Sequence, residues 1–477
     1  MLFNSLQFAV FFVIVYGLYL LLDHKWQNRM LLLASYVFYG AWDWRFLALL
    51  FFSTLYNFGW GLAIHKTPDV RRQRLFLILA VFGNLAVLGF FKYFHFFQQN
   101  LICLLNFCGL SLHPVFLNII LPLGISFYTF QAMSYVLDIY RRQMIPTEKF
   151  FDFALFVAFF PQLVAGPIER AKNLLPQIQH PRHLTMEKFF EGAHLVLWGL
   201  FLKVYIGDNL AKIVDPIFTP GLAVNGAAVL VGTYAFCFQA FCDFAGYSKM
   251  ARGLAKMMGI EIMVNFRLPY FVTNPQAFWN HWHISLSSWV RDYIYFPVFA
   301  SLQRIRGTSK VYIAVMVAMI LMGLWHGAAW NFVLWGVYNG LAIVIYTVLR
   351  PKVFKWVTPR NPVLKNVWLA VRILWMFQVS AVGMLIFRSA GYGHMMVLLR
   401  TLFFRFHWEP QHGDILLKVV LFIAPLLVIQ VGKFVTGDLR FLYRRHWVLK
   451  TYAYSLMTYL LLGWGVFTAE RFIYFQF

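Results

Sequence analysis

Charged residues are few in this chain, and acidic residues are the scarcest of them. Only 12% of its 477 residues are charged, and 18 Asp and Glu stand against 41 Lys and Arg, which gives a formal net charge of +23. Soluble domains carry about 25% charged residues, so the composition excludes an ordinary soluble fold. Hydrophobic residues make up 61% of the chain and aromatic residues 20%. These shares predict a polytopic membrane protein, built from helices.

The basic residues do not indicate a nucleic-acid partner. They lie in short clusters between apolar runs rather than along one amphipathic face. Such clusters follow every second run, at Lys25 and Arg29, at Lys66, Arg71, Arg72 and Arg74, and at Arg141 and Arg142. Because the clusters lie between apolar runs, we expect no nucleic-acid partner. Basic loops stay in the cytoplasm, so we expect an extracytoplasmic N-terminus.

Cysteine is also rare. The four cysteines, Cys103, Cys108, Cys237 and Cys242, lie in apolar segments and match no zinc-binding spacing. We therefore predict four small buried hydrophobic side chains and no metal site.

Apolar runs of about 20 residues are candidate membrane spans. They lie near residues 5–23, 30–42, 46–64, 75–96, 117–139, 150–167, 188–208, 224–245, 311–330, 331–349, 366–388, 414–436 and 450–469. The first run has no basic residues before it and no cleavage site, so we expect a span rather than a removable signal. The longest polar stretches hold too little apolar material for a soluble core, which predicts one membrane domain over residues 1–477.

The segment from Gly246 to Pro297 departs from this pattern. Polar and apolar residues alternate closely there, and Pro269 and Pro275 interrupt any helix. Within a bilayer such backbone is tolerated only where protein encloses it or it lines a wet cavity. The segment is therefore expected to form re-entrant or half-buried helices inside the outer spans.

Three polar residues recur at helical spacing just before this segment. Gln239, Asp243 and Tyr247 form one stripe on an apolar span. Two interpretations stay open: hydrogen bonding between membrane helices, and one wall of a substrate cavity.

Histidines lie in two of the most apolar blocks. If residues 274–295 form one helix, one face carries His281, Ser285, Ser288 and Asp292, and the opposite face carries His283, Ser287 and Arg291. The two histidines would then point apart, which argues against a metal site. His326 lies between Gly323 and Gly327, which allow a neighbouring backbone to approach closely. It is either a core histidine bonded to a carbonyl or, as intramembrane ionisable groups usually are, functional.

Five blocks in this order resemble the membrane-bound O-acyltransferase (MBOAT) family, and within it the branch that acetylates alginate, peptidoglycan or cellulose. They are Phe160–Arg170, Cys242–Gly253, Asn265–Tyr270, Phe278–Tyr295 and Gly323–Asn331. One departure follows Tyr295, where the chain reads Phe296-Pro297-Val298 and many relatives carry a Gly-Gly pair.

The resemblance implies a fold and a site. The fold is a ring of about 11 transmembrane helices around a thin centre with re-entrant helices, with a signature core at about residues 120–345 and C-terminal spans at about 366–469. His326 would be the family's essential histidine and His283 its auxiliary one. The residues expected along the substrate passage are Trp279, Asn280, Trp282, Ser287, Arg291, Gln239, Asp243, Tyr247, Trp325 and Asn331.

The chemistry of these side chains fits acyl transfer. A hydroxyl is a poor nucleophile, so a base is needed, and apolar burial keeps an imidazole neutral and able to accept the hydroxyl proton. His326 is the expected base, and His283 would either donate a hydrogen bond to the developing oxyanion or orient the acceptor. No serine shows the sequence context of a catalytic triad.

The resemblance also implies the substrates and the location. Acetyl-CoA would be the donor, with no tightly bound cofactor, and basic residues such as Arg170, Lys172, Arg304, Arg306 and Lys310 would attract its phosphates or anchor the loops. The acetyl group would pass across the bacterial inner membrane to an extracytoplasmic partner resembling a serine hydrolase, which esterifies a cell-surface polysaccharide. The alternatives are a D-alanyl-type transferase that uses an acyl carrier protein and a non-enzymatic transporter.

Overall fold

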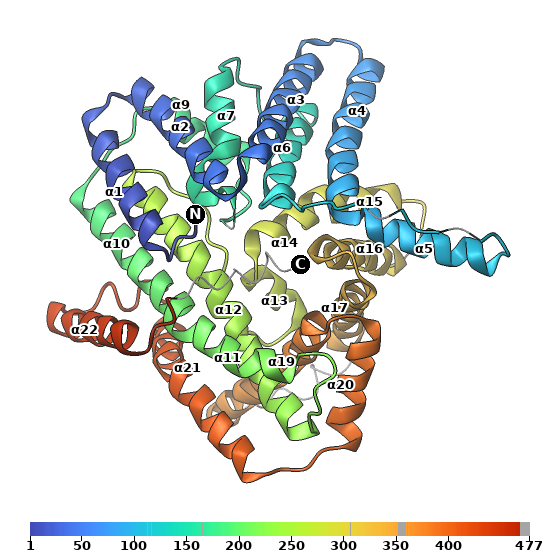
Figure 1. Ribbon diagram of the computed structural model, residues 1–477, viewed down its shortest axis with the longest axis vertical. Coiled ribbons are helices and arrows are strands. Elements are labelled where there is room, and N and C mark those ends of the chain that lie inside the picture. The colour runs from blue at the N-terminus through green and yellow to red at the C-terminus, as the bar shows by residue number, and fades with distance from the viewer. Residues whose placement is uncertain are drawn as a thin grey trace. The chain divides into compact units, whose positions relative to one another are not determined.

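The computed structural model of this chain describes residues 1–111, 113–115, 117–164, 166–305, 307–351, 359 and 361–467. Ala165 and Arg306, both named above, lie outside the described residues. Helices make up the regular structure throughout the described part of the chain, which contains no strand (Figure 1). The predicted all-α class is confirmed.

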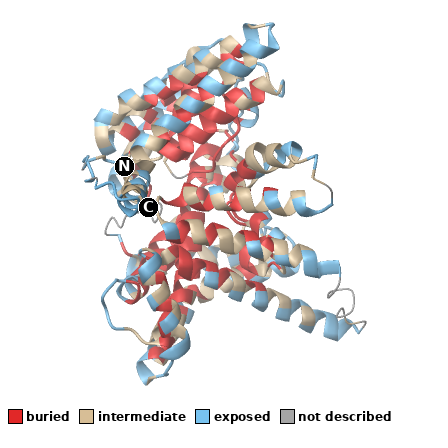
Figure 2. Ribbon diagram, turned by 90° about the vertical axis from the view of Figure 1, so that its right-hand side faces the viewer, coloured by how far each residue is buried: buried red, intermediate tan, exposed pale blue. Residues whose placement is uncertain are grey.

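The helices group into two compact units. Unit 1 comprises Met1–Val196 and Met250–Met263, and unit 2 comprises Leu197–Lys249 and Val264–Phe477. Within each unit, buried residues follow one side of most helices and exposed residues the other (Figure 2). The single membrane domain expected over residues 1–477 stays a prediction.

Unit 1 holds the N-terminal helices. In chain order they are α1 (Leu6–Leu21), α2 (His24–Asp43), η1 (Trp44–Phe46), α3 (Leu47–Lys66), α4 (Val70–Leu88), η2 (Gly89–Tyr93), α5 (Phe94–Phe107), α6 (Ile125–Tyr140), α7 (Phe150–Ala158), α8 (Phe160–Leu163), α9 (Ala171–Gln179) and most of α10 (Met186–Leu200). Short polar residues start several of them, since the side chains of Ser5 and Asp23 accept backbone N–H groups of the first turns of α1 and α2.

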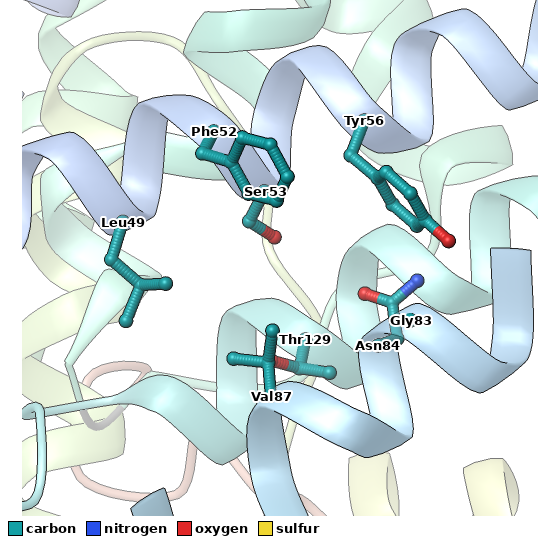
Figure 3. A pocket seen from close by; sticks show the side chains of 8 residues that line it. All are labelled: Leu49, Phe52, Ser53, Tyr56, Gly83, Asn84, Val87 and Thr129. Carbon is teal, nitrogen blue, oxygen red and sulfur yellow. The ribbon is translucent and has the colours of Figure 1, made fainter. Parts of the chain in front are cut away.

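Polar side chains join α3 and α4 inside unit 1. The buried amides of Asn57 and Asn84 exchange two hydrogen bonds, of 3.1 and 2.8 Å. Next to them, side chains from α3, α4 and α6 line a small cavity of about 150 Å³ (Figure 3). Reciprocal amide bonds of this kind hold helices together where no water competes.

Unit 2 holds the remaining helices. In chain order they are η3 (Phe201–Gly207), α11 (Asp208–Ile217), α12 (Gly226–Met257, whose end belongs to unit 1), η4 (Pro269–Phe271), α13 (Pro275–His281), α14 (Ile284–Val290), η5 (Arg291–Tyr295), α15 (Phe296–Ser301), α16 (Ser309–His326), α17 (Trp330–Leu349), α19 (Pro362–Arg388), α20 (Tyr392–Phe404), α21 (Pro410–Thr436) and α22 (Trp447–Trp464). Elements η3 and η5 are π-helical. The expected departure from long helices is confirmed after Met257, because η4, α13, α14, η5 and α15 are all short, but it begins later than Gly246 since α12 continues to Met257.

Eight helical stretches of the described chain are long and apolar enough to cross a membrane. They are His24–Lys66, Val70–Phe107, Met186–Ile217, Gly226–Met257, Ser309–His326, Trp330–Leu349, Pro362–Arg388 and Pro410–Thr436. Several separately predicted spans merge, because α2, η1 and α3 run on as one helical stretch. The implied number of about 11 stays a prediction.

The expectation for the cysteines is half right. Cys237 and Cys242 are buried in α12, but Cys103 and Cys108 are exposed at the end of α5. Apolar sequence around a cysteine indicates burial in a soluble protein, whereas a helix in a bilayer can turn the same side chain toward lipid.

Candidate functional site

The first histidine block forms two helices rather than one. Trp282 has extended backbone angles and His283 has φ 43° and ψ 53°, so the chain turns sharply between α13 and α14. The expectation of one helix over residues 274–295, with fixed opposite faces, is therefore wrong. A bulky residue in the left-handed region is a strained conformation that persists only where the surroundings hold it.

Asn265 holds this turn. Its carbonyl oxygen accepts the N–H of Ile284 at 3.0 Å, and its side-chain oxygen accepts the N–H of Ser285 at 3.1 Å. These two N–H groups belong to the first turn of α14, where no partner exists within the helix. The amide of Asn265 in turn donates to Ser248 on α12, at 3.2 Å. A distant residue thus caps α14 and sets the direction of the His283 side chain.

The second histidine lies where α16 and α17 pack backbone against backbone. A side chain at Gly323 would overlap the carbonyl oxygen of Phe332, and one at Gly327 would overlap the ring of the same residue. The predicted close approach beside His326 is confirmed. It places the last turn of α16 against the start of α17, with His326 only 4% exposed.

The indole ring of Trp325 lies close to the imidazole rings of both histidines. The ring centroid of Trp325 is 6.0 Å from that of His283 and 4.9 Å from that of His326. We call these three residues the histidine cluster. All three are buried. Trp325 connects two histidine blocks that lie about 40 residues apart, and no pattern in the sequence predicted this contact.

Aromatic rings enclose His326 on its other sides. Its ring centroid lies 5.0 Å from that of Trp335 and 5.2 Å from that of Phe387, both in edge-to-face arrangements. Trp279 packs on Trp335 at 5.5 Å. Trp335 and Phe387 therefore form an apolar wall beside His326, and the sequence analysis identified neither of them.

Two more expected passage residues are buried near this region. The amide of Asn331 donates to the carbonyl oxygen of Ser389 at 2.9 Å, while its side-chain oxygen is buried without a hydrogen-bond partner. Trp282 stacks on Phe278 with ring centroids 5.6 Å apart. A buried acceptor left open is costly, so the Asn331 oxygen is well suited to a ligand's donor.

Three further candidates differ in surroundings. Asn280 and Arg291 are exposed, and Arg291 pairs with its neighbour Asp292 at 2.9 Å. The Ser287 hydroxyl donates to the carbonyl oxygen of Trp282 at 3.0 Å. Ser287 therefore supports the turn before α14, and the roles of Asn280 and Arg291 in a passage stay predictions.

The stripe on α12 joins a buried ion cluster. Lys203 of η3 lies 2.6 Å from Asp243 and 2.7 Å from Asp208, and we call these three residues the ion cluster. The ammonium of Lys203 also lies 5.9 Å from the ring centre of Tyr247. Asp243 and Tyr247 thus bond between helices, as the first of the two interpretations expects. Gln239 is buried, and its side-chain oxygen has no hydrogen-bond partner.

The sequence contained a signal for this cluster that was not used. Lys203 is a lysine within an apolar run, and an intramembrane charge normally has an opposite charge as partner. Asp208 and Asp243 are acidic residues in or beside the neighbouring apolar runs, so they could have been predicted as the partners of Lys203.

The described residues contain no group of three or more His, Cys, Asp or Glu side chains arranged for a metal ion. The cavity between α3, α4 and α6 and a second one at the ends of α3 and α6 are lined by residues of unit 1, and none of these residues belongs to the histidine cluster. A tunnel that reaches His326 stays a prediction.

Unit 1 contains a buried carboxylate in the first family block. Glu169 is 1% exposed and accepts the backbone N–H of Met263. Burial raises the pKa of Glu169 to about 7, although the neighbouring Arg170 and Arg252 act in the opposite direction. Arg170 is itself buried, so it is not among the solvated basic residues that would attract a donor's phosphates.

Comparison with known proteins agrees with the apolar helices of this chain. Residues 56–387 match the membrane-bound O-acyltransferase family. The chain is 42% identical to a probable alginate O-acetylase, AlgI, of Azotobacter vinelandii over 354 residues, 73% of this chain and 69% of that protein. It is 34% identical to a peptidoglycan O-acetyltransferase of Helicobacter pylori, over 69% of this chain and 68% of that protein. It is 29% identical to a teichoic acid D-alanyltransferase of Streptococcus thermophilus, over 47% and 56%.

The fold and these matches show that the chain is a multi-pass membrane protein built from helices. The chain belongs to the membrane-bound O-acyltransferase family, since the match covers well over half of its length. It is an O-acyltransferase, and the non-enzymatic transporter considered above is set aside.

Proposed function

We propose that this enzyme transfers an acetyl group from acetyl-CoA to the hydroxyls of a cell-surface polysaccharide, with the histidine cluster as its catalytic centre. The observation that carries the proposal is that the rings of His283 and His326 both lie beside the ring of Trp325, with centroids 6.0 and 4.9 Å from it. The named activities of the alginate and peptidoglycan relatives support acetyl as the acyl group.

His326 is assigned the role of general base. In apolar surroundings the neutral form of an imidazole is favoured, and Trp335 and Phe387 supply such surroundings. The neutral ring takes the proton of the acceptor hydroxyl as its oxygen attacks the thioester carbonyl. A carbon–oxygen bond forms, the carbon–sulfur bond breaks, and the thiol leaves with a proton. General base catalysis contributes roughly 10² to 10⁴ in rate.

His283 is assigned to the carbonyl oxygen. Negative charge develops there during the attack, and an N–H fixed in advance stabilises it without reorganisation. The turn that Asn265 caps keeps the His283 ring in one direction, which is what such a donor needs. The open oxygen of Asn331 would bind a donor group of the substrate.

The location of donor and acceptor supports a membrane enzyme. Acetyl-CoA carries phosphates that do not cross lipid, while cell-surface hydroxyls lie beyond the membrane. We assign the enzyme to the bacterial inner membrane with an extracytoplasmic N-terminus, as the basic clusters indicate. The proposed direct acceptor is a separate extracytoplasmic protein resembling a serine hydrolase, which then passes the acetyl group to the polymer.

The test is to purify the chain with this partner and follow acetyl-CoA consumption. In His326→Ala we expect turnover to fall by roughly 10² to 10⁴ with an unchanged unfolding temperature. The matched control is His281→Gln, because the His281 side chain bonds within its own helix, to the carbonyl oxygen of Ala277 at 2.7 Å. Undiminished turnover in His326→Ala would remove the assigned base.

The donor has its own test, because one relative is a D-alanyltransferase. Acetyl-CoA and an acyl group on a carrier protein are offered separately to the same preparation. We expect turnover with acetyl-CoA alone. Turnover only with the carrier-bound acyl group would replace acetyl-CoA by a carrier protein as the donor.

A further inference from the structure

Unit 1 has a cavity of about 550 Å³ where α3 and α6 end. One part of its wall is polar and comes from His65, Gln73, Arg142 and Gln143, and another is apolar and comes from residues such as Ile64, Ile139 and Ile145. The apolar run of α3 ends at His65 and Lys66, so the cavity lies where a span leaves the hydrocarbon.

Positive charge gathers around this cavity. The segments 65–74 and 139–145 contain six Lys and Arg against the single acidic residue Asp69: Lys66, Arg71, Arg72, Arg74, Arg141 and Arg142. Asp69 lies 3.7 Å from Arg72. The carbonyl ends of α3 and α6 favour cations here, which explains part of the cluster, but the cations exceed what these helix ends need.

Arg142 has an unusual backbone for its residue type. It follows the end of α6 with φ 58°, and the N–H groups of Arg142 and Gln143 bond back to Ile139 and Asp138, each at 2.9 Å. In this helix ending the position of Arg142 is normally taken by glycine. An arginine held in such a conformation indicates that its side chain is used, and this side chain lines the cavity.

We propose that this cavity binds the phosphate group of an anionic glycerophospholipid. Phosphate is the common chemistry that Arg142, Gln143 and His65 recognise through their N–H groups. The apolar wall and the position at the end of a span favour a phosphate that carries acyl chains over a soluble one. Polybasic segments at the membrane surface attract anionic lipid in the same way.

The experiment measures lipid binding by the full chain in detergent micelles. Native mass spectrometry counts bound phosphatidylglycerol, with phosphatidylcholine as the neutral lipid. We compare Arg142→Gln and Arg142→Gly with the control Arg74→Gln, which removes a charge from the same cluster but not from the cavity wall. Arg142→Gly also removes the backbone strain at this position, because glycine adopts the left-handed conformation freely. A loss of lipid binding in this variant therefore does not come from a strained backbone.

The expected result is preferential binding of phosphatidylglycerol, weakened about five-fold at low salt in both Arg142 variants and hardly in Arg74→Gln. Equal binding in parent and Arg142→Gly overturns the proposal, and so does an equal loss in Arg74→Gln. A third arm adds adenosine 3′,5′-bisphosphate. Displacement of the lipid by this nucleotide would assign the cavity to a soluble phosphate instead. Acetyl transfer is not the readout, so the result stands apart from the proposed function.

Discussion

The histidine cluster and the ion cluster are both polar, both buried and both in unit 2, but they satisfy burial in different ways. In the ion cluster one ammonium lies within 2.7 Å of two carboxylates. In the histidine cluster the two imidazoles lie beside aromatic rings, those of Trp325, Trp335 and Phe387. The ion cluster is thus held together by opposite charges, whereas the histidine cluster packs among aromatic rings.

The difference teaches that an intramembrane polar residue is not by itself a sign of catalysis. Asp243 was a candidate for the substrate passage on the same ground as His326. Its contact with Lys203 joins α12 to η3, because a buried charge without a partner is strongly unfavourable, and its place in the passage stays a prediction. The predictions below test this distinction.

The largest effect is expected for Lys203→Met. It leaves two buried carboxylates without their cation, which costs about 3 to 5 kcal/mol of unfolding free energy. Thermal unfolding in detergent measures it. The triple variant that adds Asp208→Asn and Asp243→Asn removes all the charges and should recover most of the stability.

One outcome would reverse the assignment of the ion cluster. If Asp243→Asn left the unfolding temperature unchanged but abolished acetyl transfer, Asp243 would line the substrate passage after all. The exposed Lys66→Met serves as the control, with an expected change below about 0.5 kcal/mol.

Glu169 extends the comparison to a buried acid held by a backbone N–H. Its pKa in the folded state is about 7, against 4.5 as its ordinary value. The folded state therefore binds the extra proton, and its contribution to stability is present at low pH and lost as the pH rises from about 4.5 to 7. Glu169→Gln should be flat over this range and, at pH 8, more stable than the parent by about 3 kcal/mol.

The check is the unfolding temperature of parent and Glu169→Gln at pH 5 and pH 8. The two should differ little at pH 5. An equal dependence on pH in both proteins would show that Glu169 does not change its protonation on folding.

His283 tests the other side of the comparison. Asparagine tolerates the left-handed conformation. Its side-chain amide reaches the position of the His283 Nδ1 atom but is too short to reach the position of Nε2. We expect His283→Asn to fold and to lose about 10²-fold in turnover, the typical value of one oxyanion donor. His283→Gln, which reaches toward the Nε2 position, should recover part of it. Full activity in His283→Asn would remove the oxyanion role from Nε2.

The smallest effect is expected for Asn265→Ala. The loss of its side-chain cap on α14 should cost about 1 kcal/mol of stability. Because the turn then holds His283 less firmly, turnover should fall while the KM for acetyl-CoA changes little. A fall in stability without any change in turnover would limit Asn265 to a structural role.

Much of the architecture could be predicted from the sequence, because composition and run length decide what a bilayer accepts. The close approach at Gly323 followed from spacing alone, and both histidine blocks were found by their polarity in apolar surroundings. The predicted helix over residues 274–295 failed because Asn265, a distant residue, caps a turn in its middle. The neighbours of His326 on α17 and α19 were equally hidden, since packing between helices leaves no periodic signal.

Element η3 imposes a constraint of a different kind on the chain. A π-helical turn contains one residue more than an α-helical turn, and each residue rotates the direction of the next side chain by about 100°. A residue inserted or deleted between Lys203 and Asp208 would therefore change the direction of the Lys203 side chain relative to the Asp208 carboxylate. Variation among natural relatives should therefore exchange side chains in Phe201–Gly207 far more freely than it changes the number of residues there.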